Sequence, residues 1–233
     1  MGYDMTAMSE ATPAEKALHE AACEVFSQAQ DALKAAGEQP PWGDEASTPL
    51  QRAWEEAWDR RAATDVTYFR LNVWGMGIAR DLMDRMGMLT WVETSGVDSP
   101  LPPWPTDAQV KAERERLGRT EEQDDWAERG EGAWRLLATP RLAWTMTDSP
   151  TLLGHKLCSN DPWLITAGEC KAVAMRWEQL KGTPELAEIL AGGTGDDGTE
   201  LGRRASLTEL PRWWDRWMAW HERCAQRGGY VQG

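Results

Sequence analysis

The feature that most constrains the fold is a repeated helix start signal. Residues 12–15 read Thr-Pro-Ala-Glu, residues 48–51 read Thr-Pro-Leu-Gln, and residues 166–169 read Thr-Ala-Gly-Glu. In this pattern the threonine side chain accepts a backbone N–H of the first turn, and the acidic or amide side chain three residues later reaches back to the cap. Proline also suits the first helical position. These segments therefore predict helix N-termini from local chemistry alone.

Apolar spacing and stop signals extend these starts into helices. The first helix is expected to end at Gly37, with one set of apolar residues at helical spacing: Leu18, Ala22, Val25, Phe26, Ala29 and Leu33. The second helix places Trp54 and Trp58 on one face. Asn72 can cap a third helix, which is expected to stop near Gly87. Further helices are expected over residues 106–117, 167–181, from Thr183 onward, and 208–227.

Short strands are expected at both ends of the chain and near its middle. They comprise residues 3–5, 163–166 and 230–231, and residues 68–71 also favour an extended conformation. The strand at Trp163 runs directly into the helix start at Thr166. The predicted fold class is α+β, predominantly helical, with a small sheet formed by terminal and central short strands. The 233 residues fit a single domain, 1–233.

Residues 95–135 interrupt this regular pattern. Four prolines lie between residues 100 and 105, and a strongly charged stretch follows from Lys111 to Glu131. Proline clusters mark loops, and charge runs mark solvated segments. We therefore expect a loop-rich charged insertion here that carries one exposed helix over residues 106–117.

The net charge of -13 limits the possible partners. Nucleic-acid binding draws its sequence-independent affinity from Lys and Arg, so direct DNA or RNA binding is disfavoured. The electrostatic field of this negative charge attracts basic protein partners. The charge could equally have no role beyond keeping the protein soluble. No apolar run approaches the roughly 20 residues that span a bilayer, and the four cysteines are scattered. We expect a cytoplasmic protein with reduced cysteines and no membrane partner.

Each of the three histidines has a cysteine three or four residues behind it. The pairs are His19–Cys23, His155–Cys158 and His221–Cys224. Two converging pairs would form a tetrahedral Cys2His2 zinc site. The favoured alternative is that they are ordinary, partly buried residues of amphipathic helices. No metal and no cofactor is therefore predicted.

Catalytic motifs are not found in the sequence. There is no Gly-x-Ser-x-Gly elbow or papain-like cysteine motif, and the glycine-rich residues 192–198 lack the Gly-Lys-Ser/Thr ending of a phosphate loop. These residues also carry two carboxylates, which would repel phosphate. The protein is predicted not to be an enzyme and to have no small-molecule substrate.

The last helix offers the first candidate partner-binding residues. Its tryptophans span an apolar arc wider than a minimal core stripe, so Trp214 and Trp217 are expected in the core. Trp213 and Trp220, together with Met218, lie at the margins of this arc. We expect all three side chains to remain exposed and the two tryptophans to anchor a partner.

The polar turn before the central strand offers a second candidate surface. Ser159, Asn160 and Asp161 can contact a partner, or they can simply bond to nearby backbone amides and direct the strand that follows. Both interpretations stay open.

Several segments resemble a family of small proteins from Streptomyces phages and related mobile elements. They are residues 1–5, residues 68–72 with Trp74-Gly75-Met76, residues 155–166 and residues 228–231. The family includes recombination directionality factors, which switch a large serine integrase from integration to excision. The resemblance implies a protein that binds the integrase itself in the cytoplasm of a bacterial host. Residues 92–150 lie outside the resemblance.

Two other functions fit parts of the sequence. An acidic anti-defence protein or DNA mimic would also bind a basic, nucleic-acid-binding protein. Such a mimic needs carboxylates arrayed on one face, whereas here the acids are interspersed with arginines. A zinc-binding protein is the third possibility, and it rests on the His/Cys pairs alone.

Overall fold

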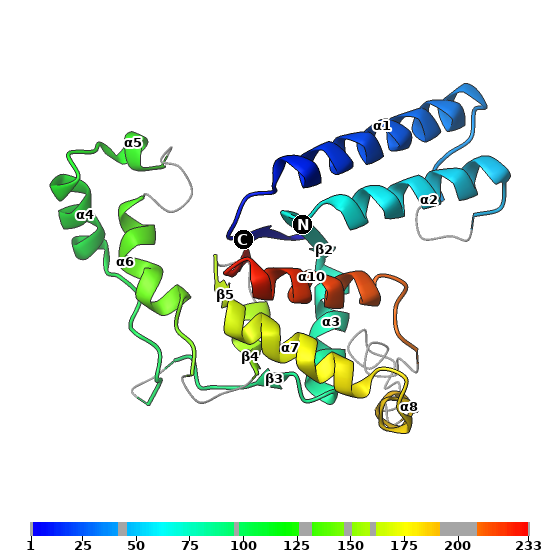
Figure 1. Cartoon of the computed structure of the whole chain (residues 1–233). Helices are drawn as coiled ribbons and strands as arrows, with labels where there is room; N and C mark the ends of the chain where they lie inside the picture. The colour runs from blue at the N-terminus through cyan, green and yellow to red at the C-terminus, as the bar shows by residue number, and fades with distance from the viewer. Residues whose placement is uncertain are drawn as a thin grey trace.

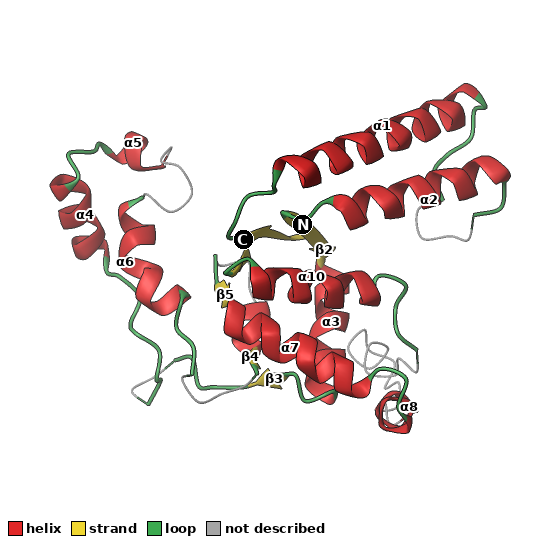
Figure 2. Ribbon diagram, viewed as in Figure 1, coloured by secondary structure: helices red, strands yellow, loops and turns green. Residues whose placement is uncertain are grey.

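The structure confirms the predicted α+β class, which is predominantly helical (Figure 2). It is a computed structural model, and it describes residues 2–41, 46–95, 98–125, 132–146, 151–158, 162–191 and 209–232. In chain order the elements are β1 (Gly2–Ala7), α1 (Pro13–Ala35), α2 (Pro49–Thr64), β2 (Tyr68–Asn72), α3 (Val73–Arg85), β3 (Leu89–Thr90), α4 (Asp107–Arg116), α5 (Glu121–Asp125), α6 (Ala133–Leu142), β4 (Leu152–Leu153), η1 (Gly154–Leu157), β5 (Leu164–Thr166), α7 (Ala167–Leu180), α8 (Pro184–Ala191), α10 (Trp214–Gln226) and β6 (Gly229–Gln232). No helix in these ranges has the length and apolar character to cross a bilayer.

A four-stranded sheet joins the two ends of the chain. Its order is β2-β1-β6-β5, with every neighbouring pair antiparallel. Tyr3 pairs with Leu71, and Val231 pairs with both Thr6 and Leu164. The sheet predicted from the two termini and the strand near Trp163 is therefore confirmed. Its four strands come from the same segments that carry the family resemblance.

The predicted helix starts have the expected cap geometry. Thr12, Thr48, Thr106 and Thr166 each form a complete capping box, and Asn72 Oδ1 accepts from Gly75 N at 2.6 Å. Two helices therefore follow directly from strands, α3 from β2 and α7 from β5. β2 and β5 are the two edge strands of the sheet, so one strand–helix unit lies at each edge.

The core lies where α3, α7 and α10 pack beneath the sheet (Figure 1). The strands contribute Met5, Ile165 and Tyr230, each with 0% of its surface exposed. Helix α10 contributes Trp214 and Trp217, which are equally enclosed at 1% and 0%. Their burial confirms the core positions expected for these two tryptophans.

Helices α1 and α2 form an antiparallel hairpin that projects from the body (Figure 1). Phe26 packs against both Trp54 and Trp58, with ring centroids 5.6 and 5.5 Å away, and the two indoles stack on each other. Leu18 and Val25 instead point outward and are 60% and 39% exposed. The helix expected between Thr12 and Gly37 is therefore confirmed, and its apolar residues divide between the α2 contact and the surface.

The segment between β3 and β4 leaves the body and returns to the same place. Leu89 pairs with Leu152 in a parallel ladder, which closes the base of the excursion. We call the part that contains α4, α5 and α6 the arm; Figure 1 shows it set apart from the body. Helix α4 confirms the helix expected over residues 106–117. The prediction of a single helix is wrong, because α5 and α6 follow it.

Candidate functional site

The two tryptophans expected to anchor a partner differ in exposure. Trp213 is half-buried and packs against Trp214, with ring centroids 6.2 Å apart. Trp220 is 0% exposed and packs against Phe69 and Tyr230. Met218 is 2% exposed. The expectation that Trp220 and Met218 stay exposed is wrong, because α10 lies between α7 and the sheet and both sides of its wide apolar arc are covered.

The second predicted surface, Ser159, Asn160 and Asp161, lies outside the described residues. Its flanks are described on both sides. Cys158 is exposed, and Arg135 of α6 donates to the carbonyl oxygen of Pro162 at 2.8 Å. The Arg135 bond joins α6 of the arm to the residue that leads into β5, at the junction between the arm and the body.

Aromatic side chains gather at this junction. Trp104 and Trp134 stack with centroids 5.6 Å apart and planes inclined by 21°, and Trp104 also lies 5.8 Å from Trp163. We call these three residues the tryptophan platform. Trp104 and Trp134 are each 37% exposed, whereas Trp163 is 4% exposed. The platform thus has a buried base and two accessible indoles.

Arg141 fixes the platform from the arm side. Its guanidinium lies 4.5 Å from the ring centroid of Trp104, and it donates to the carbonyl oxygens of Pro102 and Thr94 at 2.5 and 2.8 Å. Such a cation over an indole face is attractive, and burial strengthens the attraction. The proline-rich segment that holds Trp104 is therefore tied to α6.

His155 forms the base of the platform. Its ring meets Trp163 edge-on at 4.8 Å, it is 8% exposed, and neither ring nitrogen has a hydrogen-bond partner among the described residues. Burial, helped by the charges of Lys156 and Arg141, lowers its pKa from 6.5 to about 4. The imidazole is therefore neutral at physiological pH and packs as an apolar ring.

A buried ion pair holds the segment of His155 in place. Lys156 Nζ donates to Glu169 Oε2 at 2.9 Å and to the Leu164 carbonyl oxygen at 2.8 Å, and burial lowers the pKa of Lys156. Glu169 also accepts from the backbone N–H groups of Thr166 and Leu153 at 2.8 and 3.3 Å. One carboxylate thus connects β4, η1 and the start of α7.

The sequence patterns did not predict that these three tryptophans would lie together. Trp104 and Trp134 lie in the part of the chain outside the resemblance, and they are 59 and 29 residues from Trp163. One available signal was Trp104 itself, which stands between two prolines. Proline favours an extended backbone and disfavours the helix that would bury a neighbouring side chain.

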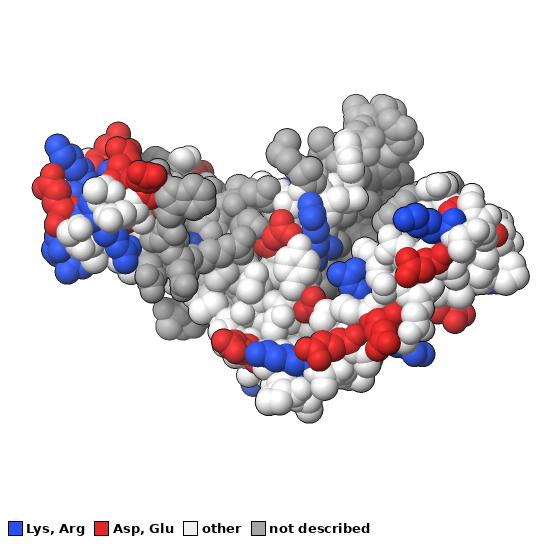
Figure 3. Space-filling model, turned by 90° about the horizontal axis from the view of Figure 1, so that it is seen from above, with Lys and Arg blue, Asp and Glu red and all other residues white. Residues whose placement is uncertain are grey.

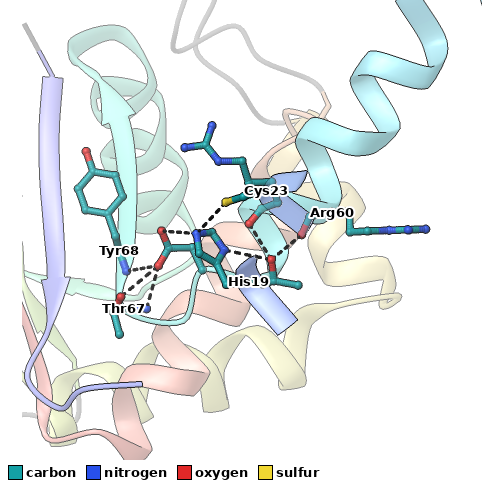
Figure 4. Close-up of polar contacts among 8 residues, drawn as sticks. His19, Cys23, Arg60, Thr67 and Tyr68 are labelled. Atoms are coloured by element: carbon teal, nitrogen blue, oxygen red, sulfur yellow. Dashed lines mark hydrogen bonds and ion pairs between the residues drawn. The ribbon is translucent and has the colours of Figure 1, made fainter. Parts of the chain in front are cut away.

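The His19–Cys23 pair belongs to a separate polar cluster that joins α1 to the end of α2 (Figure 4). His19 Nδ1 lies 3.2 Å from Thr64 Oγ1, and its Nε2 lies 3.4 Å from Cys23 Sγ and 3.8 Å from Asp65 Oδ2. The Thr64 hydroxyl donates to carbonyl oxygens one turn earlier, at 3.1 and 3.0 Å. It can therefore only accept from His19, which places a proton on Nδ1.

This cluster differs from a Cys–His–Asp catalytic triad. In a triad the carboxylate bonds to the imidazole nitrogen that faces away from the nucleophile. Here Asp65 and the thiol face the same nitrogen, and Thr64 occupies the other one. Asp65 Oδ1 also accepts from Thr67 N and Tyr68 N at 3.2 and 3.0 Å. The cluster borders a cavity of about 440 Å³ and fastens the hairpin to the sheet.

The other two His/Cys pairs do not join it. His221 Nδ1 lies 3.0 Å from the Trp217 carbonyl oxygen and its Nε2 lies 3.3 Å from Tyr230 Oη, while Cys224 is buried with a pKa raised to about 12. His155 packs against Trp163 of the platform. Across the described ranges, no three His, Cys, Asp or Glu residues are grouped so as to hold a metal ion. The zinc alternative has no site in that part of the chain.

Charges of both signs share the surface seen in Figure 3. Blue and red side chains alternate over the arm at the left and over the hairpin at the right. Ion pairs form both in the arm, where Arg116 and Glu113 are 2.6 Å apart, and between α10 and α2, where Arg216 and Asp59 are 3.0 Å apart. Where this face is described, acidic side chains are therefore interspersed with Lys and Arg, in contrast to the carboxylate array that a DNA mimic requires.

Comparisons with known proteins give no relative from which to take a function. The chain matches no protein-family model, no curated protein and no solved structure. The function must therefore be inferred from the surfaces described above and from the resemblance of its strand segments.

Proposed function

We propose that this protein regulates phage site-specific recombination by binding another protein, as a recombination directionality factor that binds a large serine integrase and favours excision. The observation that carries the binding role is the tryptophan platform, with Trp104 and Trp134 each 37% exposed and Arg141 stacked on the first. Tryptophan and arginine are the residues that most often dominate binding energy at protein interfaces. The integrase as partner follows from the resemblance.

The platform suits an anchor role because it is rigid before binding. Trp104 is held by Trp163 beneath it and by Arg141, which is bonded to backbone carbonyls. A side chain that is already ordered loses little conformational entropy when a partner covers it. The exposed indoles can therefore contribute most of their contact energy to the complex.

A directionality factor needs no chemistry of its own. The integrase supplies the nucleophile, so the factor must only bind one arrangement of its DNA-bound subunits more tightly than another. A tenfold preference corresponds to about 1.4 kcal/mol of differential contact, and equal binding would shift nothing. Two exposed indoles are enough for a difference of this size.

The charge supports a protein partner over DNA. A net charge of -13 opposes the phosphate backbone and attracts a basic, DNA-binding protein. The DNA-mimic alternative uses the same attraction but requires a carboxylate array, and the face in Figure 3 carries both signs of charge.

The test is recombination between left and right prophage sites by the cognate integrase, with and without this protein. Excision is expected only when the protein is present. Equal excision in both reactions would overturn the directionality proposal and make the inhibitor alternative the leading one.

A further inference from the structure

A groove of about 870 Å³ runs between α7 and α10, away from the tryptophan platform. The two helices lie side by side and run in opposite directions (Figure 1). Each lines the groove with residues at i, i+3, i+4 and i+7, the spacing of a single helix face. They are Lys171, Ala174, Met175 and Glu178 of α7, and Asp215, Met218, Ala219 and Glu222 of α10.

The floor of the groove is apolar and shallow. Ala174 and Ala219 are half-buried and Met218 is 2% exposed, whereas Met175 remains 52% exposed on the α7 side. Small residues allow another backbone to approach closely, and methionine adapts its shape to a partner. Two parallel ridges with a floor of this kind accept a third helix by ridge-into-groove packing.

The rims of the groove differ in charge. The α10 rim carries Asp215 and Glu222, both exposed. On the α7 rim Lys181 forms an ion pair with Glu178 at 2.5 Å, and Lys171 adds a further cation. The α10 side is therefore acidic, and a cationic flank on the occupant would complement it.

We propose that this groove binds an amphipathic helix of a partner protein, with an apolar stripe against Met175, Ala174 and Ala219 and Lys or Arg along the edge that faces α10. The chain's own exposed helix face is a poorer occupant. Leu18 and Val25 of α1 are exposed, but Glu20 and Glu24 stand beside them. A second copy would therefore bring carboxylates against the acidic rim.

The proposal is tested on the full chain with two labelled helical peptides. Both carry the same leucine and alanine stripe, and one has lysine where its twin has glutamate on the stripe edges. Fluorescence anisotropy measures their affinities for the wild type, M175E, D215K/E222K and the matched control E20K/E24K on α1. All the substituted positions are exposed, and circular dichroism checks that each variant folds.

The lysine peptide is expected to bind the wild type about tenfold more tightly than its twin. M175E should abolish binding, D215K/E222K should reverse the preference, and E20K/E24K should change neither affinity. The proposal is overturned if neither peptide binds saturably, if D215K/E222K keeps the original preference, or if sedimentation shows a dimer that M175E dissociates. This assay contains no integrase, so its outcome is independent of the recombination test.

Discussion

Replacing Lys156 with methionine tests how the base of the platform is held. Lys156 Nζ is enclosed, with 0% side-chain exposure, and its partner Glu169 is 2% exposed. Methionine keeps most of the aliphatic volume and removes the cation. The substitution leaves the Glu169 carboxylate without its counter-charge and the Leu164 carbonyl oxygen without this donor.

The expected cost is large relative to the whole stability of a domain. Removing one partner of a buried ion pair costs about 3–5 kcal/mol, because the remaining charge stays buried and uncompensated. Domains of ordinary size are stable by about 5–15 kcal/mol in total. K156M should therefore lose about a fifth or more of the free energy of unfolding.

Urea denaturation followed by tryptophan fluorescence gives the free energy of unfolding. The second variant, K156M/E169Q, removes both charges and keeps an amide that can accept from Thr166 N. The free energy of unfolding of the double variant should be at least about 1.5 kcal/mol higher than that of K156M. A cost below about 1 kcal/mol for K156M, or strictly additive effects of the two substitutions, would refute the uncompensated-charge argument.

Three further outcomes are expected. Burial lowers the pKa of His155 from 6.5 to about 4, so the unfolded chain binds the extra proton first and His155 contributes a fall of roughly 2 kcal/mol in the free energy of unfolding between pH 7 and pH 5. Burial also lowers the pKa of His221 to about 4, which adds to the fall; H155F should therefore reduce the fall by roughly 2 kcal/mol without abolishing it, in urea titrations at both pH values. Gly229 has φ +102° and an added Cβ would overlap the Ile165 carbonyl oxygen, whereas Gly182 has φ +73° and open space around it. G229A should therefore lower the free energy of unfolding by at least about 3 kcal/mol and G182A by about 1 kcal/mol, and thermal unfolding compares the two variants. Mobility-shift assays at physiological salt should detect no complex with random duplex DNA, and a sub-micromolar, salt-dependent complex would contradict the charge argument.

Local chemistry explains the parts of the fold that the sequence predicted. A capping box satisfies backbone groups within four residues, so the starts at Thr12, Thr48 and Thr166 could be placed without knowledge of the fold. The sheet was predicted because its strands lie at the two ends of the chain and just before the helix start at Thr166.

The failed expectations depend on contacts between distant elements. Trp220 is covered because the sheet lies on one side of α10 and α7 on the other, which the helix sequence alone does not record. Helix α6 contains Pro140, a residue that argues against a helix interior. The platform joins Trp104, Trp134 and Trp163 only after the arm folds back on the body.

The most direct test of platform-mediated binding is the affinity of the purified cognate integrase for W104A/W134A, measured by calorimetry. The control is W74A, which removes another exposed indole, 54% accessible, from the start of α3. The double variant should bind at least about tenfold more weakly than the wild type, while W74A should stay within about twofold. Equal affinities for the wild type and W104A/W134A would contradict the role of the platform.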